Sequence, residues 1–358
     1  MNVLVTGVGR YLGAHLAARL VDHPRVSRVI GIDTTPPTGA LADLLGDRVD
    51  TVTSDLRGLI GAVTEGEVEA VAHMGVLSSS GRGGRPAMKE HNIIGTMQLL
   101  AAGQAAPGLR KLVVRSSTAA YGASFRDPAV FTESTPPTLI PRGGFAKDVI
   151  EVEGYVRGFT RRRPDVITTV LRLAPLVGPN ADTTLTRYFA LPVVPTVFGR
   201  DPRLQFIHVE DALEVLVRSV VEDHKGTFNV AGPGVMVLSQ AIRRAGRIGV
   251  PVMEPGMSAF AAFVKASGIG EFNLDQLDLF VHGRVVDIAR LTEEFGFRPR
   301  STQEAFDDFV QGRGLHRAGA SATLRPDAVS AIEAMIIDGI RAVRAATAGR
   351  PRREPAHD

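Results

Sequence analysis

The sequence predicts an α/β protein in which a doubly wound parallel sheet carries a smaller C-terminal lobe. Short apolar runs rich in β-branched residues alternate with segments of helical periodicity through the first half of the chain. A glycine-rich turn lies between the first apolar run and the first helical segment. In sheets of this kind, ligands bind beyond the carboxyl ends of the strands, where that turn would lie.

The elements of the first half follow from the spacing of their apolar residues. A strand is expected over residues 3–5 and a helix over 11–22, where Leu12, Leu16 and Leu20 recur at helical spacing. Further strands are expected over 29–32, 70–74, 111–114 and 168–173, with a helix over 92–105. This alternation favours parallel strands with helices on both faces.

The second half is less regular, because prolines at positions 192, 195 and 202 interrupt it. A strand over 206–209, a helix over 211–221 and a strand over 226–232 are expected there. We therefore expect the sheet domain to span 1–178 and to be completed by about 205–232, with a smaller lobe formed by 179–204 and 233–318.

Residues 319–358 are expected to form an amphipathic helix followed by a tail rich in Arg and Pro. The apolar face of this helix consists of Val329, Ile332, Ile336, Ile340 and Val343. The helix has three candidate partners: the body of the protein, a second copy in a homodimer, or an anionic membrane surface. We favour the first two over the membrane, because Glu333 and Asp338 interrupt the basic face.

Composition excludes several classes of protein. The 358 residues contain no cysteine, which excludes disulfides, thiolate metal sites and a cysteine nucleophile. The net charge of +3 is that of residues 341–358, with five arginines against two acids, so the body offers no basic stripe for nucleic acid. The nine histidines show no metal-ligand spacing. The N-terminus lacks a signal-peptide pattern, and we expect a cytoplasmic protein.

The glycine-rich turn predicts a dinucleotide site. Its sequence is Thr6-Gly7-Val8-Gly9-Arg10-Tyr11-Leu12-Gly13, in which glycines let backbone amides approach a diphosphate at the N-terminus of the following helix. Asp33 ends the second expected strand, about 20 residues further on, where a carboxylate accepts hydrogen bonds from an adenosine ribose. The two features together indicate a Rossmann-type fold.

These residues resemble the NAD-dependent epimerase/dehydratase family of the extended short-chain dehydrogenase/reductase superfamily, over most of residues 1–310. In that family the three glycines of the turn match Gly7, position 10 and Gly13; here position 10 is Arg, and the extra glycine is Gly9. The resemblance implies that cofactor contacts come from Gly7, Gly9, Arg10, Tyr11, Leu12, Gly13, Asp33, Asp55, Leu56, Met74, Gly75, Asn92, Ser116 and Lys147.

The expected cofactor is NAD. An arginine in this turn often accompanies NADP in shorter relatives, which would assign Arg10 to a phosphate. Asp33 opposes that choice, because its carboxylate would repel a 2′-phosphate. We therefore place NADP second.

The resemblance fails at the catalytic position. Family members deprotonate a substrate hydroxyl with a tyrosine four residues before a lysine, while a serine holds the same oxygen. The matching lysine is Lys147 and the serine Ser117, but Gly143 stands where the tyrosine belongs. Tyr11, Tyr121, Lys147 or Asp148 would have to replace the phenol, and the sequence does not show which of them reaches the site.

Two functions follow from this pattern. The first is an NAD-dependent enzyme that acts on a nucleotide-sugar or another hydroxylated metabolite with an altered acid/base site. The second is a non-catalytic NAD(P)-binding sensor or scaffold. Two substrate contacts of the family are also replaced: Pro175 occupies the position of a family asparagine, and Leu204 that of a family arginine. Dehydratase chemistry is disfavoured, because Thr118-Ala119 replace an Asp-Glu pair.

Overall fold

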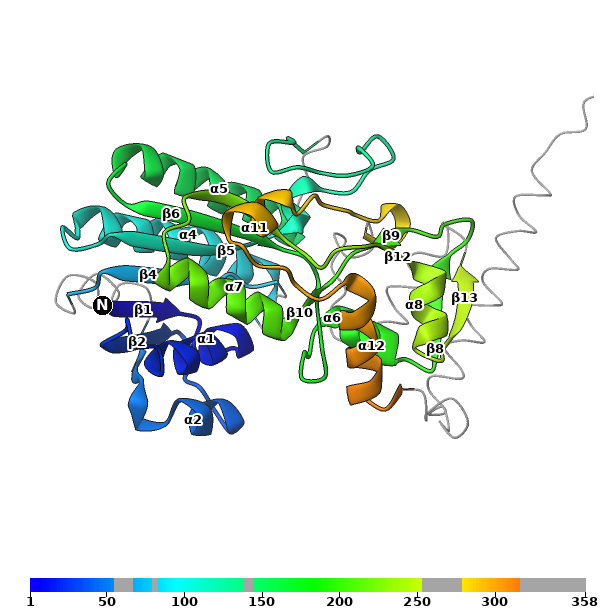
Figure 1. Cartoon of the computed structure of the whole chain (residues 1–358), viewed down its shortest axis with the longest axis horizontal. Helices are drawn as coiled ribbons and strands as arrows, with labels where there is room; N and C mark the ends of the chain where they lie inside the picture. The colour runs from blue at the N-terminus through cyan, green and yellow to red at the C-terminus, as the bar shows by residue number, and fades with distance from the viewer. Residues whose placement is uncertain (55–66, 79–82, 138–143, 253–278, 316–358) are drawn as a thin grey trace, which may run out of the picture.

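A seven-stranded parallel sheet forms the centre of the computed structural model, which describes residues 1–54, 67–78, 83–137, 144–252 and 279–315. The strand order is β11-β6-β5-β4-β1-β2-β3, and every neighbouring pair is parallel (Figure 1). The strands are β1 (Asn2–Thr6), β2 (Arg28–Asp33), β3 (Asp50–Thr53), β4 (Ala70–His73), β5 (Lys111–Ser117), β6 (Ile167–Leu173) and β11 (Gly226–Val230).

Helices cover both faces of this sheet. Alternate residues of β1 point to opposite sides, so Val3 and Val5 pack in one core with α1 (Tyr11–Val21) and α7 (Val209–Val221). Leu4 packs in the other core with α4 (Gly84–Ala105) and α5 (Gly144–Arg162). Both faces are therefore apolar, which explains why the strands read as continuous apolar runs.

The smaller lobe lies beyond one end of the sheet (Figure 1). It contains α6 (Thr184–Ala190), α8 (Leu238–Arg244) and α12 (Thr302–Gly312). Its short paired strands are β7 (Leu176–Val177) with β10 (Ile207–His208), β8 (Val193–Val197) with β13 (Ile248–Val252), and β9 (Arg203–Leu204) with β12 (Met236–Val237). The core of the lobe is aromatic: Phe306 packs against Phe189, Phe206 and Phe309.

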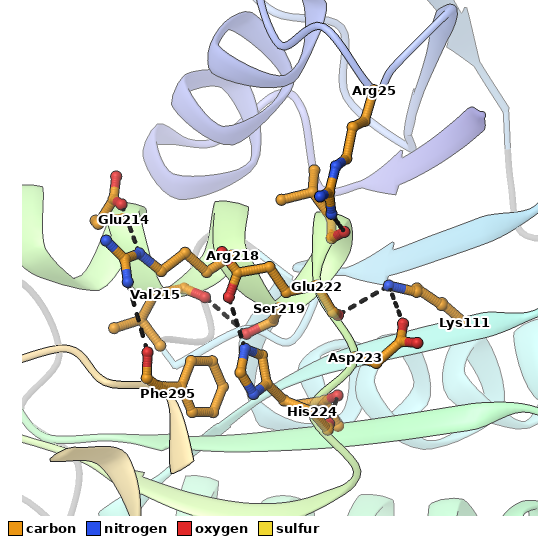
Figure 2. Close-up of polar contacts among 12 residues, drawn as sticks. Arg25, Lys111, Glu214, Val215, Arg218, Ser219, Glu222, Asp223, His224 and Phe295 are labelled. Carbon is orange, nitrogen blue, oxygen red and sulfur yellow. Dashed lines mark hydrogen bonds and ion pairs between the residues drawn. The ribbon is translucent and has the colours of Figure 1, made fainter. Parts of the chain in front are cut away.

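Helix α7 returns the chain from this lobe to the edge of the sheet, and polar contacts hold its C-terminal end (Figure 2). Lys111 at the start of β5 donates to the Glu222 carbonyl (2.8 Å) and pairs with Asp223 (2.6 Å). Arg218 bonds to Glu214 one turn earlier (2.7 Å). The next residue after Asp223, His224, stacks on Phe295 (3.7 Å), which follows α11 (Ala289–Glu294). These contacts direct the chain into β11 beside β6.

The strands predicted over the first half are confirmed. The strand predicted over 226–232 corresponds to β11, and the helix predicted over 11–22 corresponds to α1. Among the described elements of the sheet domain, the sequence did not predict β3, α2 (Ala40–Leu45), α5 or the 3-10 turns η1 (Gly46–Arg48) and η3 (Thr118–Tyr121). Helix α4 begins at Gly84, eight residues before its predicted start. The segment 319–358 lies outside the described residues. Within the part of the chain that is described, no helix is both long and apolar enough to cross a membrane.

We expect the aromatic core to dominate the stability of the smaller lobe. Phe306 is fully buried, so Phe306→Ala should lower the free energy of unfolding by about 3–5 kcal/mol, because the truncation removes apolar packing and leaves a cavity. Phe198→Ala is the matched control, because that ring is 63% exposed and its loss should change stability by less than about 0.5 kcal/mol. Chemical denaturation of both variants measures the difference, and equal effects would contradict this packing.

Candidate functional site

The turn between β1 and α1 is built on close backbone approaches that only glycine permits. Gly7 has φ +79°, and its amide donates to the Ile32 carbonyl (2.8 Å). A Cβ on Gly7 would lie 2.9 Å from the Gly75 Cα, and one on Gly13 would lie 2.1 Å from the Gly7 carbonyl oxygen. The first turn of α1 therefore lies directly against the end of β1, with its free amides at the edge of the sheet.

Asp33 lies at the end of β2 beside this turn and is 7% exposed. Its carboxylate accepts from the amides of Gly9 (3.1 Å) and Thr35 (3.2 Å) and from the Thr34 hydroxyl (3.3 Å). Gly9 is required for this approach, since a Cβ there would lie 2.3 Å from the Thr35 carbonyl oxygen. The carboxylate is thus held at the turn with acceptor capacity left for one further donor.

A chain of hydrogen bonds fixes the loop that follows β4. The Thr96 hydroxyl donates to a carbonyl of α4 (2.6 Å), so it accepts from the His73 Nε2–H (2.9 Å). The bare Nδ1 of His73 then accepts from the Thr6 hydroxyl (2.9 Å), whose oxygen accepts the amides of Met74 and Gly75 (3.1 Å each). His73 is therefore neutral and locks the loop to the end of β1.

A cavity of about 370 Å³ extends from the N-terminus of α1, past the ends of β4, β5 and β6, to α6 in the smaller lobe. Among the predicted site residues, its lining includes Arg10, Tyr11, Leu12, Gly13, Met74, Ser116 and Ser117. A second, much smaller cavity beside it is lined by residues that include Gly7, Asp33 and Gly75. With Gly9, which bonds to Asp33, the structure thus gathers most of the predicted turn and strand-end residues around one site.

Asn92 and Ser116 bond to protein groups. Asn92 bonds to the Leu77 amide (2.7 Å) and carbonyl (3.0 Å) and to Asp148 (3.0 Å). Ser116 donates to the buried Glu153 (2.6 Å). Both side chains therefore support the loop and strand beneath the cavity, and a direct contact between either one and the cofactor stays a prediction.

Lys147 lies in the first turn of α5, half-buried, and is absent from the lining of the main cavity, although Phe145 contributes to it. Ser117 does line the cavity, and its Oγ accepts from the Ala119 amide (3.1 Å), which leaves its own proton to donate. The predicted contacts Asp55 and Leu56, and Gly143 at the tyrosine position, lie outside the described residues.

The candidate replacements for the missing phenol differ in position. Tyr11 lines the cavity, where burial and then the charge of Glu210 raise the pKa of its phenol. Tyr121 is buried and donates to Asn229 (2.7 Å), and burial raises its pKa also. Asp148 is fully buried and is paired with Arg85 (2.5 Å). Among these three, the cavity therefore exposes only the Tyr11 phenol.

The lining of the main cavity is strongly basic, a feature that the sequence did not reveal. Among its described residues it has four arginines, Arg10, Arg115, Arg187 and Arg284, against one acid, Asp182. Arg187 pairs with Asp182 (2.5 Å), so the one acid of this described lining is already neutralised. A cavity with this balance attracts anionic ligands.

Comparison with known proteins agrees with this geometry. The model of the NAD dependent epimerase/dehydratase family matches residues 3–231. The chain belongs to this family. An uncharacterized protein of Mycobacterium tuberculosis is 45% identical over 317 residues, which cover 87% of this chain and 84% of that relative. A probable UDP-arabinose 4-epimerase of Oryza sativa is 27% identical over 198 residues, or 51% of this chain and 47% of the relative.

Solved epimerases and dehydratases share the fold. The UDP-glucose-4-epimerase of Stenotrophomonas maltophila, with bound NAD and formylated UDP-arabinopyranose, matches with a TM-score of 0.68 at 21% identity, covering 89% of this chain and 98% of the other. The dTDP-glucose 4,6-dehydratase of Bacillus anthracis, in complex with NAD, matches with a TM-score of 0.66 at 17% identity, covering 88% and 96%. The Rossmann-type fold predicted for this epimerase/dehydratase family member is confirmed.

Because folded His73 is neutral, we expect the stability of the protein to depend on pH. Burial lowers the pKa of His73 to about 3, from 6.5 in the unfolded chain, with further contributions from His91 and Arg115. Between these values the unfolded chain binds a proton that the folded chain does not, so stability falls as the pH is lowered through this window. From a pH of about 7.5 to about 5.0 this group should cost about 2 kcal/mol of unfolding free energy.

Urea denaturation of wild type and His73→Gln at the two pH values measures this contribution. The variant should be less stable at the higher pH, because it loses the bridge between Thr6 and Thr96, but it should lose about 2 kcal/mol less on acidification. Other titrating groups contribute equally to both proteins and cancel. Parallel pH profiles would show that His73 is not buried in its neutral form.

Proposed function

We propose that this protein binds NAD across the carboxyl ends of β1, β2 and β4 and acts on a nucleotide-sugar or a related hydroxylated metabolite, with an altered acid/base site. The observation that carries the proposal is the basic cavity that joins the N-terminus of α1 to the smaller lobe. The outer part of that cavity is lined by α6, where the second ligand would bind beside the dinucleotide.

The residues of the turn fit a dinucleotide. Backbone approaches as close as those at Gly7 and Gly13 leave the amides of the first turn of α1 open to a diphosphate, and that turn contains no acidic residue. The hydrogen bond from the Gly9 amide fixes Asp33 at the end of β2, where a hydroxyl of the adenosine ribose would donate to it. Its negative charge favours NAD over NADP, which carries a phosphate on that ribose.

The charge of the lining supports an anionic second ligand. NAD carries two phosphate charges and one positive nicotinamide, so it would neutralise only part of the arginine excess. A nucleoside diphosphate-sugar supplies two more negative charges. Arg187 on α6 and the buried Arg284 lie on the side of the smaller lobe, where they could anchor the substrate in place of the asparagine and arginine that the family carries at positions 175 and 204.

The chemistry expected is oxidation of a substrate alcohol, in which the carbon gives up a hydride and the hydroxyl proton passes to a base or to solvent, followed by return of both or by release of the oxidised product. NAD, when bound, supplies the hydride acceptor. Ser117 would donate its hydroxyl proton to a substrate oxygen and so hold that oxygen in place. Tyr11 is the one phenol among the described residues of the lining, but its raised pKa makes it a better proton donor than acceptor at neutral pH.

The role of Asp33 is tested by the affinities of the two dinucleotides. Wild type should bind NAD more tightly than NADP in calorimetry. Asp33→Ser should lower the affinity for NAD about 10- to 100-fold, because a charged hydrogen bond contributes about 1.5–3 kcal/mol. The difference between the affinities for NAD and NADP should become smaller. Arg10→Ala is the comparison: tighter binding of NADP that weakens in this variant would assign the turn to NADP instead.

The altered acid/base site is tested with Gly143→Tyr, which restores the family residue. Incubated with NAD and a UDP-sugar, this variant should turn over about 10²–10⁴-fold faster than wild type, the usual contribution of a general acid/base. Product analysis by mass spectrometry measures both proteins, and Gly143→Phe controls for the ring without the hydroxyl. If neither protein reacts although wild type binds NAD tightly, a sensor or scaffold role replaces the enzymatic one.

A further inference from the structure

Arg115 is a cation in the cavity without a matching anion among the described residues. It lies on β5, two residues before Ser117, so both side chains lie on the same face of the strand. Its guanidinium donates to the Val76 carbonyl (2.8 Å), and the side chain lines the main cavity. That one bond uses one of the five N–H donors of the group.

Two other arginines near the cavity have a carboxylate partner, which Arg115 lacks among the described residues. Arg172 on β6 forms a bidentate pair with Glu153 (2.7 and 2.9 Å), and Arg187 pairs with Asp182. Arg115 has no carboxylate within 4 Å anywhere in the described part of the chain. Burial, and then the like charge of Arg10, lower its pKa to about 10.

The surroundings of Arg115 are positive as well. Arg10 occupies the N-cap of α1, its side chain forms no capping bond, and no acidic residue lies in the first turn of that helix. The helix N-terminus adds about half a positive charge. Two guanidinium groups and a helix N-terminus thus meet at one end of the cavity, an arrangement that is unfavourable until an anion binds there.

We propose that Arg115 binds a phosphate oxygen of the NAD diphosphate, acting together with the N-terminus of α1. Val76, to which Arg115 is anchored, directly follows Gly75, and Gly75 touches Gly7 of the turn. The guanidinium is thereby held next to the loop that borders the diphosphate position. This inference rests on the proposed binding of NAD and adds to it a side-chain contact from β5.

Arg115→Met tests the contact, because it keeps the length and apolar part of the side chain and removes the charge. NAD affinity, measured by calorimetry, should fall about 10- to 100-fold, the usual effect of losing a charged hydrogen bond. The variant without ligand should have a higher melting temperature than wild type, since an unpaired cation has been removed. A purely structural arginine would give the opposite sign, because its loss lowers the melting temperature.

Three comparisons make the test specific. Arg218→Met removes the same charge at an ion pair outside the cavity and should leave NAD affinity unchanged. Adenosine, which lacks the diphosphate, should bind wild type and Arg115→Met equally. A UDP-sugar titrated in the absence of NAD identifies the source of the diphosphate: if only its affinity falls in Arg115→Met, the assignment to NAD is wrong.

The failure of this inference differs from failure of the proposed function. If wild type does not bind NAD, the proposed function is wrong. If wild type binds NAD and Arg115→Met binds it equally well, or if the unliganded variant is less stable, the inference about Arg115 is overturned while NAD binding stands.

Discussion

The site depends on one constraint: the backbone of the β1–α1 turn must touch the backbone of the loop that follows β4. Gly7 and Gly75 meet with no room for a side chain between them, and Gly13 lets α1 begin directly against the turn. The Thr6 hydroxyl joins the same two segments by accepting both loop amides. The N-terminus of α1, the acid at the end of β2 and the anchor of Arg115 all take their positions from this approach of the two backbones.

Much of the fold could be predicted, because most strands of the sheet are buried on both faces and so are apolar throughout. The strand β3 was missed for the same physical reason: it is the edge strand and its four residues Asp50–Thr53 are all exposed. Three of them are β-branched, which favours a strand, but they do not form the apolar run by which the buried strands were predicted. The early start of α4 was missed because Gly84, Arg85 and Pro86 give no helical periodicity.

The site was predictable where a residue acts through its place on the backbone, and less so where it acts through a partner distant in sequence. Asp33 was expected beside the turn from its position at the end of β2, and it lies there. Asn92 and Ser116 were assigned by motif, but their side chains bond to Asp148 and Glu153, which lie 56 and 37 residues away. Arg115 carried no signal, since its meaning depends on which acids the fold brings near it.

Binding and proton transfer are separable in this structure. The elements proposed to bind the diphosphate belong to the sheet: the turn after β1, the loop after β4 and the Arg115 side chain from β5. The core beneath them fixes their positions, and there Arg172 and Glu153 neutralise each other. The family tyrosine belongs instead to a single position before α5. The proposed replacement of that tyrosine by Gly143 would therefore remove a proton acceptor without changing the groups that would hold a dinucleotide. In the proposed function an altered acid/base site would leave binding intact, and the excess of arginines over acids in the described lining of the cavity is the physical reason to expect ligand binding.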